Sequence, residues 1–380
     1  MKKTIAVFFG GRSTEHDISI ITALSSVIKP LELTKKYDVV PVYITKKGKW
    51  LSGKALKDIE LFRSKKIETF ETKTKSAKVV LDGGLTIDGT RIDIAFPAMH
   101  GPYGEDGSLM GFLRLAGIPF VGADMDASVI AMDKVLAKQV AVSNNIPTSK
   151  FVFTTRAVFQ ASPESGVDLA EKSLKYPMFV KPAHLGSSIG ITRVANKTEL
   201  LNAIEVAAYY DEKIIIEEAV SNLIEVTVPI MGNETPQPAL VEQPLSHDGD
   251  FFDFETKYMG QGKGGKKGGA KTSGSQGYSI LPAELPGNLY DESVAVALKV
   301  YQALSLTGIA RVDLLIDEKS KTVYFNEVNP LPGSLYAHNW RAAGVSTVQL
   351  VDELVRLAEE RFAQRTAVDT TFNSSFLQQF

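Results

Sequence analysis

Apolar and polar positions alternate between strand-like and helix-like patterns over the first third of the chain. Residues 5–9 form a β-branched and aromatic run that ends in two glycines, a pattern typical of a strand entering a turn. The following segment predicts a helix that Ser13 or Thr14 can cap, with an apolar face made by Ile18, Ile21, Leu24, Val27 and Ile28. Strands are expected at 39–44, 92–97 and 119–122, with a helix starting at 111. This order predicts a parallel sheet with helical crossovers.

Two more regions of the chain have patterns of their own. The second starts near 132, with a helix at 133–144, a Gly/Ser turn at 186–190, and strands at 150–154, 178–181 and 213–217. The third has strands at 224–230, 308–316 and 322–327, then an amphipathic last helix. The charged segment 46–78 is expected to form surface helix and loop. We therefore predict an α/β protein with α+β lobes, divided into 1–131, 132–219, 220–366 and a frayed tail, 367–380.

Composition narrows the class of protein. A chain of 380 residues is long for one hydrophobic core, so several lobes are expected. The formal net charge of -2 argues against nucleic acid as the main partner. With no cysteine, disulfides, thiolate catalysis and Cys-ligated metals are excluded. No apolar stretch approaches the roughly 20 residues of a membrane span, and the N-terminal apolar run is too short for a signal peptide, so we expect a cytoplasmic protein.

One stretch, 260–271, consists almost entirely of glycine and lysine. Glycine removes steric limits and lysine adds charge, which predicts a mobile loop over 259–278. It is either a solvent-exposed connector or a cationic lid over phosphates. It is not a Walker A loop, because Ala270 stands where that motif needs glycine.

Polar side chains near the C-terminal end suggest a metal site. In two strand-like runs, alternation puts Arg311 and Asp313 on one face, and Glu327 and Asn329 on one face of the next strand. Hard oxygen ligands without histidine or cysteine suit Mg²⁺ on nucleotide phosphates. Arg311 would offer a forked donor to phosphoryl oxygens. By spacing alone, a strand whose polar side faces water is an equal alternative.

Other segments contain groups that suit phosphate binding. Lys181 ends a strand and precedes the 186–190 turn, whose backbone N–H groups can wrap phosphates. Lys134 and Lys138 share a helix face, although such a pair alone usually marks a solvated face. The segment with Glu217, Val220 and, further on, Glu225 could contact adenine and ribose, or be an ordinary strand exit.

In this order the motifs resemble those of the D-alanine–D-alanine ligases of the ATP-grasp superfamily. They include GGRSTEHDIS at 10–19, HGPYGEDG at 100–107 and MDK at 132–134. VKP at 180–182 with GSS at 186–188, the segment 253–258, RVD at 311–313 and NEVN at 326–329 follow in family order. The resemblance spans residues 4 to 362 and implies an ATP-grasp fold with a Rossmann-like N-terminal domain.

The resemblance also implies an activity and ligands. Two D-alanines would be joined for peptidoglycan precursor synthesis, through an acyl phosphate formed with ATP and two Mg²⁺ ions, for which Mn²⁺ could substitute. A homodimer is the assembly implied.

Residue roles follow by matching positions. The metal ligands would be Asp313, Glu327 and Asn329. The ATP phosphates would contact Lys138, Lys181, Ser187, Ser188 and Lys257, and adenine and ribose would contact Glu217, Val220 and Glu225. Glu15 would take the ammonium of the first substrate, in a hydrogen-bonded group with Ser187 and Tyr258. Arg311 and the N–H of Gly333 would stabilise the oxyanion, and His100 is a further substrate-site candidate.

The chain keeps the family's Pro-Gly turn at 330–333 and departs from the family pattern after Gly333. The segment 334–340 is shorter than usual, and His338 falls where a serine for the second substrate's carboxylate is expected. Ser334, Tyr336 or His338 could bind that carboxylate, His338 could be purely structural, or the acceptor could be D-serine, D-lactate or another molecule. Tyr258 favours an amine acceptor. The loop after it is also longer than usual. A nucleotide-binding module without catalysis is a third hypothesis, against which Glu15, Lys181, Arg311 and the metal set speak.

Overall fold

The N-terminal lobe is built on a mainly parallel sheet. The computed structural model describes residues 2–64, 66–245, 279–371 and 373–380. Strand β1 (Lys3–Gly10) lies between β2 (Tyr37–Ile44) and β7 (Ile94–Pro97), parallel to both, and β3 (Trp50–Ser52) adds an antiparallel edge. The predicted parallel sheet is confirmed.

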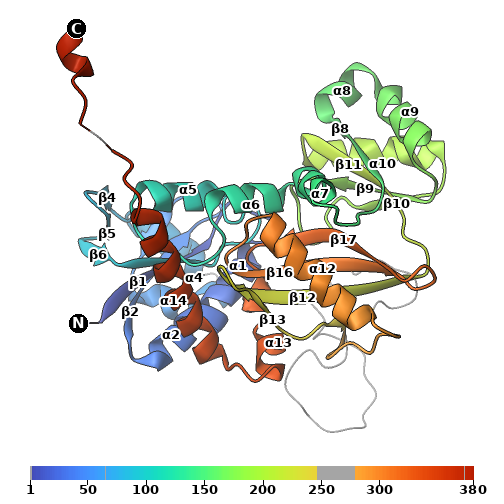
Figure 1. The fold of residues 1–380 in the computed structure, drawn as a ribbon. Coiled ribbons are helices and arrows are strands. Elements are labelled where there is room, and N and C mark those ends of the chain that lie inside the picture. The colour runs from blue at the N-terminus through green and yellow to red at the C-terminus, as the bar shows by residue number, and fades with distance from the viewer. Residues whose placement is uncertain (1, 65, 246–278, 372) are drawn as a thin grey trace.

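A nearly continuous helical segment covers one face of this sheet. It consists of α1 (His16–Ile21), a π-helical stretch η1 (Thr22–Ile28) and α2 (Lys29–Thr34), and α14 (Thr347–Thr366) packs beside α2 (Figure 1). Two predictions for it are wrong. The N-cap is Glu15, because the Ser13 hydroxyl instead accepts the Glu15 N–H at 3.0 Å. The predicted apolar face included Ile21, but this side chain is 47% exposed. The buried face instead continues through Ile20, which is 7% exposed, and the small Ala23, because these two follow the helical repeat of the buried residues.

Three short elements of this lobe also differ from prediction. Helix α5 (Ser108–Leu115) starts before the expected position 111, directly after Gly107, and ends at Leu115. Asp93 separates β6 (Thr90–Ile92) from β7, and the expected strand at 119–122 makes only one bridge, Ala95 to Phe120. These segments are too short for apolar runs alone to set their ends.

The charged segment 46–78 contains more than surface helix and loop. It includes β3 as well as the helical elements η2 (Lys54–Lys57), α3 (Ile59–Arg63) and α4 (Lys66–Lys73). Strands β4 (Val79–Leu81) and β5 (Leu85–Ile87) then form a small antiparallel sheet with β6.

The central lobe is a four-stranded antiparallel sheet with helices on one side. Helix α6 (Met125–Met132) leads into α7 (Lys134–Ser143), and the strand order is β10–β9–β11–β8. The strands are β8 (Phe151–Thr155), β9 (Met178–Pro182), β10 (Thr192–Val194) and β11 (Lys213–Glu218). Helices α8 (Arg156–Ala161), α9 (Pro163–Ser173) and α10 (Lys197–Tyr210) complete the lobe (Figure 1).

The third lobe carries the predicted metal strands. Its antiparallel sheet has the order β13–β12–β16–β17, and α12 (Leu289–Ala303) packs across it. The strands are β12 (Leu223–Gly232), β13 (Gln237–Pro238), β16 (Gly308–Asp317) and β17 (Thr322–Asn329). Strands β14 (Gln243–Pro244) and β15 (Ser279–Ile280) pair at its side, and the chain continues through η3 (Gly333–Tyr336) and α13 (Ala337–Ala342).

The last residues run away from the body of the protein as an exposed segment with one short turn, η4 (Phe376–Gln379) (Figure 1). The loop predicted over 259–278 lies outside the described residues. Within the described ranges, no helix is both long and apolar enough to cross a membrane.

Candidate active site

Two lysines predicted to contact phosphates meet at one buried carboxylate. Lys138 Nζ lies 2.6 Å from Glu217 Oε1, and Lys181 Nζ lies 2.5 Å from Glu217 Oε2. The Ser149 hydroxyl donates to Glu217 at 3.1 Å and accepts from Lys138 at 3.2 Å. Helix α7 supplies Lys138, and the paired strands β9 and β11 supply the other two. The structure thus joins three elements at one ionic group, which we call the phosphate-side cluster (Lys138, Lys181, Glu217).

The electrostatics of this cluster depend on its burial. Burial opposes the charge of Glu217, but Lys138 and Lys181 outweigh it and lower the pKa of Glu217 to about 2. Burial lowers the pKa of Lys138 despite Glu217. Burial also opposes the charge of Lys181, yet Glu217, Glu327 and Glu225 together raise its pKa. Glu217 is therefore ionised at neutral pH, and the helix face expected to be solvated is buried.

The predicted metal-binding side chains lie on directly paired positions of β16 and β17. Asp313 faces Glu327 and Arg311 faces Asn329 across the ladder, with a bulge between Asp313 and Leu314. Arg311 donates to Asp313 through Nε at 2.7 Å and through Nη2 at 2.6 Å. Lys134 Nζ lies 3.1 Å from Glu327 Oε2.

This donor set fits Mg²⁺ by its chemistry. Two carboxylates and an amide are hard oxygen ligands, and two of them occupy facing positions of neighbouring strands. Among the described residues, no group of three or more His, Cys, Asp or Glu could hold a metal, and the predicted third ligand is the side-chain amide of Asn329. Its oxygen also accepts the Leu331 N–H at 3.1 Å.

The Gly/Ser turn reaches the N-terminal lobe through Ser187. The Ser187 hydroxyl donates to Glu15 Oε1 at 2.5 Å, and both side chains are buried. Ser187 and Ser188 both have left-handed backbones, with φ of 56° and 59°. The Glu15–Ser187 contact predicted from the sequence is present, while Tyr258 and Lys257 lie outside the described residues.

The HGPYGEDG motif packs directly beneath Glu15. A Cβ on Gly101 would lie 2.5 Å from the Ser13 hydroxyl and 2.9 Å from Glu15 Oε2, so only glycine fits there. The Gly101 N–H donates to Glu105 at 2.6 Å. Burial, and then the charge of Glu15, raise the pKa of Glu105 well above its usual range.

His100 contacts the 334–340 segment through Thr22. His100 Nε2 lies 2.8 Å from the Thr22 hydroxyl oxygen, which accepts the Ser334 N–H at 2.8 Å. Burial lowers the pKa of His100 to about 4, so its ring is neutral at pH 7. The sequence indicated His100 and Ser334, but it gave no signal for Thr22, which lies on the buried helix face.

Three consecutive non-glycine residues of this segment have left-handed backbones. The φ angles are 52°, 55° and 51° at Ser334, Leu335 and Tyr336. Such residues usually occur singly, at a cost of about 1–2 kcal/mol each. The turn buries Leu335 completely and places the Tyr336 ring beneath the Arg311 guanidinium, 5.3 Å from the ring centroid. Strain at a ligand site is a common mark of function.

His338 also lies in this region. Its ring centroid is 4.5 Å from that of Tyr336, and its Nε2 is 2.9 Å from Glu242 Oε2. Glu242 is only 4% exposed and also accepts from Asn339 at 3.3 Å. Burial opposes the charge of Glu242, but these donors, His338 foremost, lower its pKa. Glu242 was missed because it has no motif and lies 96 residues from His338.

A second ionic group lies at the stem of the Gly/Ser turn. His184 Nδ1 is 3.0 Å from Asp211, its Nε2 is 3.3 Å from Asp133, and Lys213 also pairs with Asp133. Hydrogen bonds to Asp133 and Asp211 raise the pKa of His184 to about 9. Asp133 also caps α7 by accepting from Val135 and Leu136. We call His184, Asp133, Asp211 and Lys213 the stem cluster.

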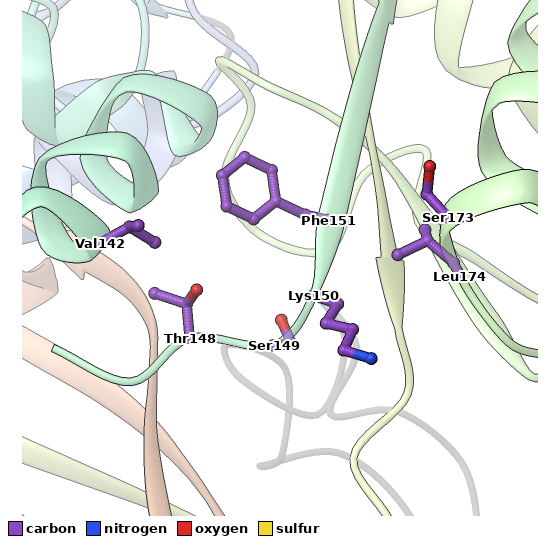
Figure 2. A pocket seen from close by; sticks show the side chains of 7 residues that line it. All are labelled: Val142, Thr148, Ser149, Lys150, Phe151, Ser173 and Leu174. Carbon is purple, nitrogen blue, oxygen red and sulfur yellow. The ribbon is translucent and has the colours of Figure 1, made fainter. Parts of the chain in front are cut away.

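A cavity of about 330 Å³ adjoins the phosphate-side cluster (Figure 2). Ser149, which bonds Glu217, lies in its wall, and the other lining residues are Val142, Thr148, Lys150, Phe151, Ser173 and Leu174. No acidic side chain lines it. The remaining predicted residues, Val220, Glu225 and Gly333, are half-buried, and Glu225 adds to the field at Lys181.

Comparisons with known proteins agree with this architecture. The family described as "D-ala D-ala ligase N-terminus" matches residues 4–123, and "D-ala D-ala ligase C-terminus" matches residues 140–356. A D-alanine–D-alanine ligase from Chloroherpeton thalassium is 36% identical, covering 96% of this chain and 98% of its own. One from Chlorobium limicola is 38% identical, with 95% and 98% covered.

Solved structures show the same fold. A D-alanine-D-alanine ligase from Coxiella burnetii superposes with a TM-score of 0.79 at 24% identity, covering 96% of both chains. A D-Ala:D-Ser ligase from Enterococcus faecalis has a TM-score of 0.76 at 31% identity, covering 94% of this chain and all of the other. The fold is that of the ATP-grasp enzymes. Within that class, the chain belongs to the D-alanine–D-alanine ligase family.

Proposed function

We propose that this protein joins two D-alanines with ATP, through an acyl phosphate, to give D-alanyl-D-alanine for peptidoglycan precursors. The match to family members over almost the whole chain is the observation that supports this most strongly. A carboxylate is a poor electrophile, so the first amino acid's carboxylate attacks the γ-phosphorus of ATP, the bond between the γ-phosphorus and the bridging oxygen breaks, and ADP leaves. The second amine then attacks the acyl carbon, loses a proton, and phosphate leaves as the peptide bond forms.

The phosphate-side cluster is assigned to ATP. Two buried ammonium groups share one carboxylate, so the site favours a further anion, and a triphosphate supplies it. Ser187, Ser188 and the backbone of their turn, together with Lys257, are assigned to the same phosphates. Glu217, Val220 and Glu225 are assigned to the adenosine side.

Asp313, Glu327 and Asn329 are assigned to Mg²⁺. When bound there, the metal would neutralise phosphoryl charge and fix the γ-phosphate for attack. Arg311, already oriented by its fork to Asp313, is placed to stabilise the tetrahedral oxyanion together with the N–H of Gly333. Water must be kept out, because acyl phosphates hydrolyse readily.

Glu15 is assigned to the ammonium of the first D-alanine. Its carboxylate is buried and oriented by Ser187, and burial together with the charge of Glu15 raises the pKa of the neighbouring Glu105. Tyr258 is assigned to the same hydrogen-bonded group, with His100 as support for the substrate wall. Ser334, Tyr336 and His338 are assigned to the acceptor's carboxylate.

Phosphate release is the direct test. Purified protein with ATP, Mg²⁺ and D-alanine should release phosphate and form the dipeptide in equal amounts. L-Alanine serves as the matched control and should give background release. Release no higher with D-alanine than with L-alanine would contradict the proposal and favour a nucleotide-binding module without catalysis.

A second candidate keeps the chemistry but changes the acceptor. A relative of 31% identity is a D-Ala:D-Ser ligase, and in the 334–340 segment the Tyr336 ring lies against Arg311 and the His338 ring lies against Tyr336. A panel of D-alanine, D-serine and D-lactate at fixed ATP separates the hypotheses. A kcat/KM for D-serine or D-lactate above that for D-alanine would replace the proposed acceptor without changing the ligase assignment.

A further inference from the structure

Three arginines surround one buried carboxylate where α5, α6 and α14 meet, on elements that carry none of the predicted site residues. Asp124 directly precedes α6 and is 2% exposed. Its Oδ2 lies 3.1 Å from Arg361 Nη2 and 3.4 Å from Arg365 Nη1, and its Oδ1 lies 3.5 Å from Arg114 Nη1. Arg114 is on α5, and the other two are on α14, whose C-terminal end lies near α5 (Figure 1). We call Asp124, Arg114, Arg361 and Arg365 the arginine cluster.

The arginine cluster carries more positive charge than its carboxylate can balance. Burial opposes the charge of Asp124, but the Met125 N–H and the nearby guanidinium groups outweigh it and lower its pKa, so Asp124 is ionised at neutral pH. Arginine is protonated throughout this pH range. Within the described part of the chain, Asp124 is the only acidic side chain that pairs with these arginines. Three guanidinium charges thus face one carboxylate charge, which leaves two positive charges in excess.

The hydrogen-bond donors of the cluster are also in excess. Asp124 Oδ1 already accepts the Met125 N–H at 2.7 Å. A guanidinium has more N–H donors than one contact with a carboxylate occupies, and Arg361 Nε is buried without a hydrogen-bond partner among the described residues. A buried donor without an acceptor costs free energy. The side chains of Arg114, Arg361 and Arg365 are 40%, 30% and 25% exposed, so a small ligand can reach them.

A purely structural link between helices does not need this composition. Arg356, on the same helix α14, has two carboxylates at 2.7 and 2.8 Å that balance its charge. The guanidinium carbon of Arg365 instead lies 5.5 Å from the ring centroids of both Phe120 and Phe362. Aromatic faces attract a cation without neutralising its charge. The excess charge of the arginine cluster therefore remains available to an anion.

We propose that the arginine cluster is a second anion site, separate from the active site, that binds a phosphate dianion. The ligand is free phosphate or the terminal group of a phosphate monoester. Guanidinium forks match the geometry of phosphoryl oxygens, and the two charges of the dianion balance the two in excess. The bound anion would fasten α14 to α5. The inference does not depend on the ligase assignment, because the phosphate-side cluster lies on other elements.

The test is Arg361→Gln, with inorganic phosphate titrated in a calorimeter at constant ionic strength. Phosphate binding at this site should weaken roughly tenfold or more, because a charge-assisted hydrogen bond is lost. The affinity for ADP should stay that of wild type. Lys181→Met should have the opposite effect, weakening ADP binding and leaving this phosphate site intact. Hydrogen exchange locates the site, since phosphate should slow exchange at the amides of 361–366 in wild type but not in Arg361→Gln.

Arg356→Gln is the matched control, because it removes a charge from the same helix where carboxylates already balance it. It should leave phosphate binding unchanged. If Arg361→Gln does not fold, Arg114→Gln carries the same expectations, since Arg114 lies on another helix and is 40% exposed. Glycerol 3-phosphate, titrated in the same way, identifies the source of the ligand. An affinity like that of phosphate supports a monoester, and one at least about tenfold weaker supports the free ion.

Three results would overturn the inference. They are phosphate binding in Arg361→Gln equal to wild type, the same loss of binding in Arg356→Gln, and no protection of 361–366 by phosphate in wild type. Each would mean that the arginines only tie α14 to α5 and α6. Calorimetry and hydrogen exchange need no turnover, so failure of the proposed ligase function is a separate result, seen as no phosphate release with ATP, Mg²⁺ and D-alanine.

Discussion

The phosphate-side cluster and the stem cluster are both built from side chains of several elements, yet their charges differ. In the first, two lysines share a single carboxylate, Glu217. In the second, the carboxylates Asp133 and Asp211 are matched by Lys213 and a His184 whose raised pKa keeps it protonated at pH 7. The stem cluster is neutral as it stands, while the phosphate-side cluster has an excess of positive charge.

This difference separates a binding site from a structural contact more clearly than burial does. Both groups are largely buried, and both shift the pKa of their members. Only the cluster with unbalanced charge gains stability when an anion arrives. Variants that alter the charge balance of each cluster should therefore respond to ATP in different ways.

The largest effect on activity is expected for Glu327→Gln. Removing a carboxylate that is assigned to Mg²⁺ should lower kcat by roughly a thousandfold or more, since metal ions contribute several kcal/mol to transition-state stabilisation. The fold should be retained, as seen by circular dichroism, because Glu327 is half-buried at a strand end. Near-normal phosphate release by this variant would contradict the metal assignment.

Glu217→Gln should be the most destabilising change within the two clusters. It leaves Lys138 and Lys181 buried together without their shared anion, and losing one partner of a buried pair costs about 3–5 kcal/mol. Urea unfolding with and without inorganic triphosphate, which makes no adenosine contact, measures this. The stabilisation by triphosphate should exceed that of wild type, and an effect equal to wild type would refute the charge argument.

Asp133→Asn should lower the free energy of unfolding less than Glu217→Gln does, and it should leave the stabilisation by ATP unchanged. Asparagine still caps α7, but the charge between His184 and Lys213 is lost. We expect a loss of about 2 kcal/mol in the free energy of unfolding, below the range for fully buried pairs. Urea unfolding should show a stabilisation by ATP like that of wild type, and an increased one would make the two clusters equivalent.

The smallest effect is a pH dependence of stability that arises from His184. Its folded pKa of about 9 exceeds the ordinary 6.5, so its contribution is complete below pH 6.5 and is lost as pH rises to 9. The ring is 36% exposed and faces Asp133 and Asp211, with Lys213 beyond, so screening reduces the loss to about 1 kcal/mol. Urea unfolding across this range measures it, and His184→Gln should flatten the profile.

Much of the fold was predictable because strands and helices carry local patterns. Patterns such as the β-branched run of β1 and the alternation around Asp313 and Glu327 placed strands in three sheets. These strands include the two that carry the predicted metal ligands. The three-residue strand β3 was missed, because three residues carry no periodicity among charged neighbours. The last turn of α1 was assigned the wrong face because Ile21, its last residue, is apolar but lies outside the buried repeat.

Site residues that lie in contiguous sequence motifs could be predicted, whereas contacts between residues far apart in the sequence could not. Asp313 and Glu327 were expected to converge, and they pair directly. The meeting of Lys138 with Glu217 could not be predicted, because the pattern around Lys138 was that of a solvated face. The same difficulty applies to Thr22, Glu242 and His184. Each contacts a partner from another part of the chain, which the local sequence pattern does not reveal.

The left-handed turn at 334–336 limits how the acceptor specificity of this protein can be engineered. Its shape depends on Leu335 inside the N-terminal core and on the Thr22 hydroxyl, which His100 contacts. A transplanted 334–340 segment from another ligase would bring new side chains but not their orientation. A successful exchange would have to move Thr22 and His100 together with the segment, because these three parts form one structural unit although they lie far apart in the sequence.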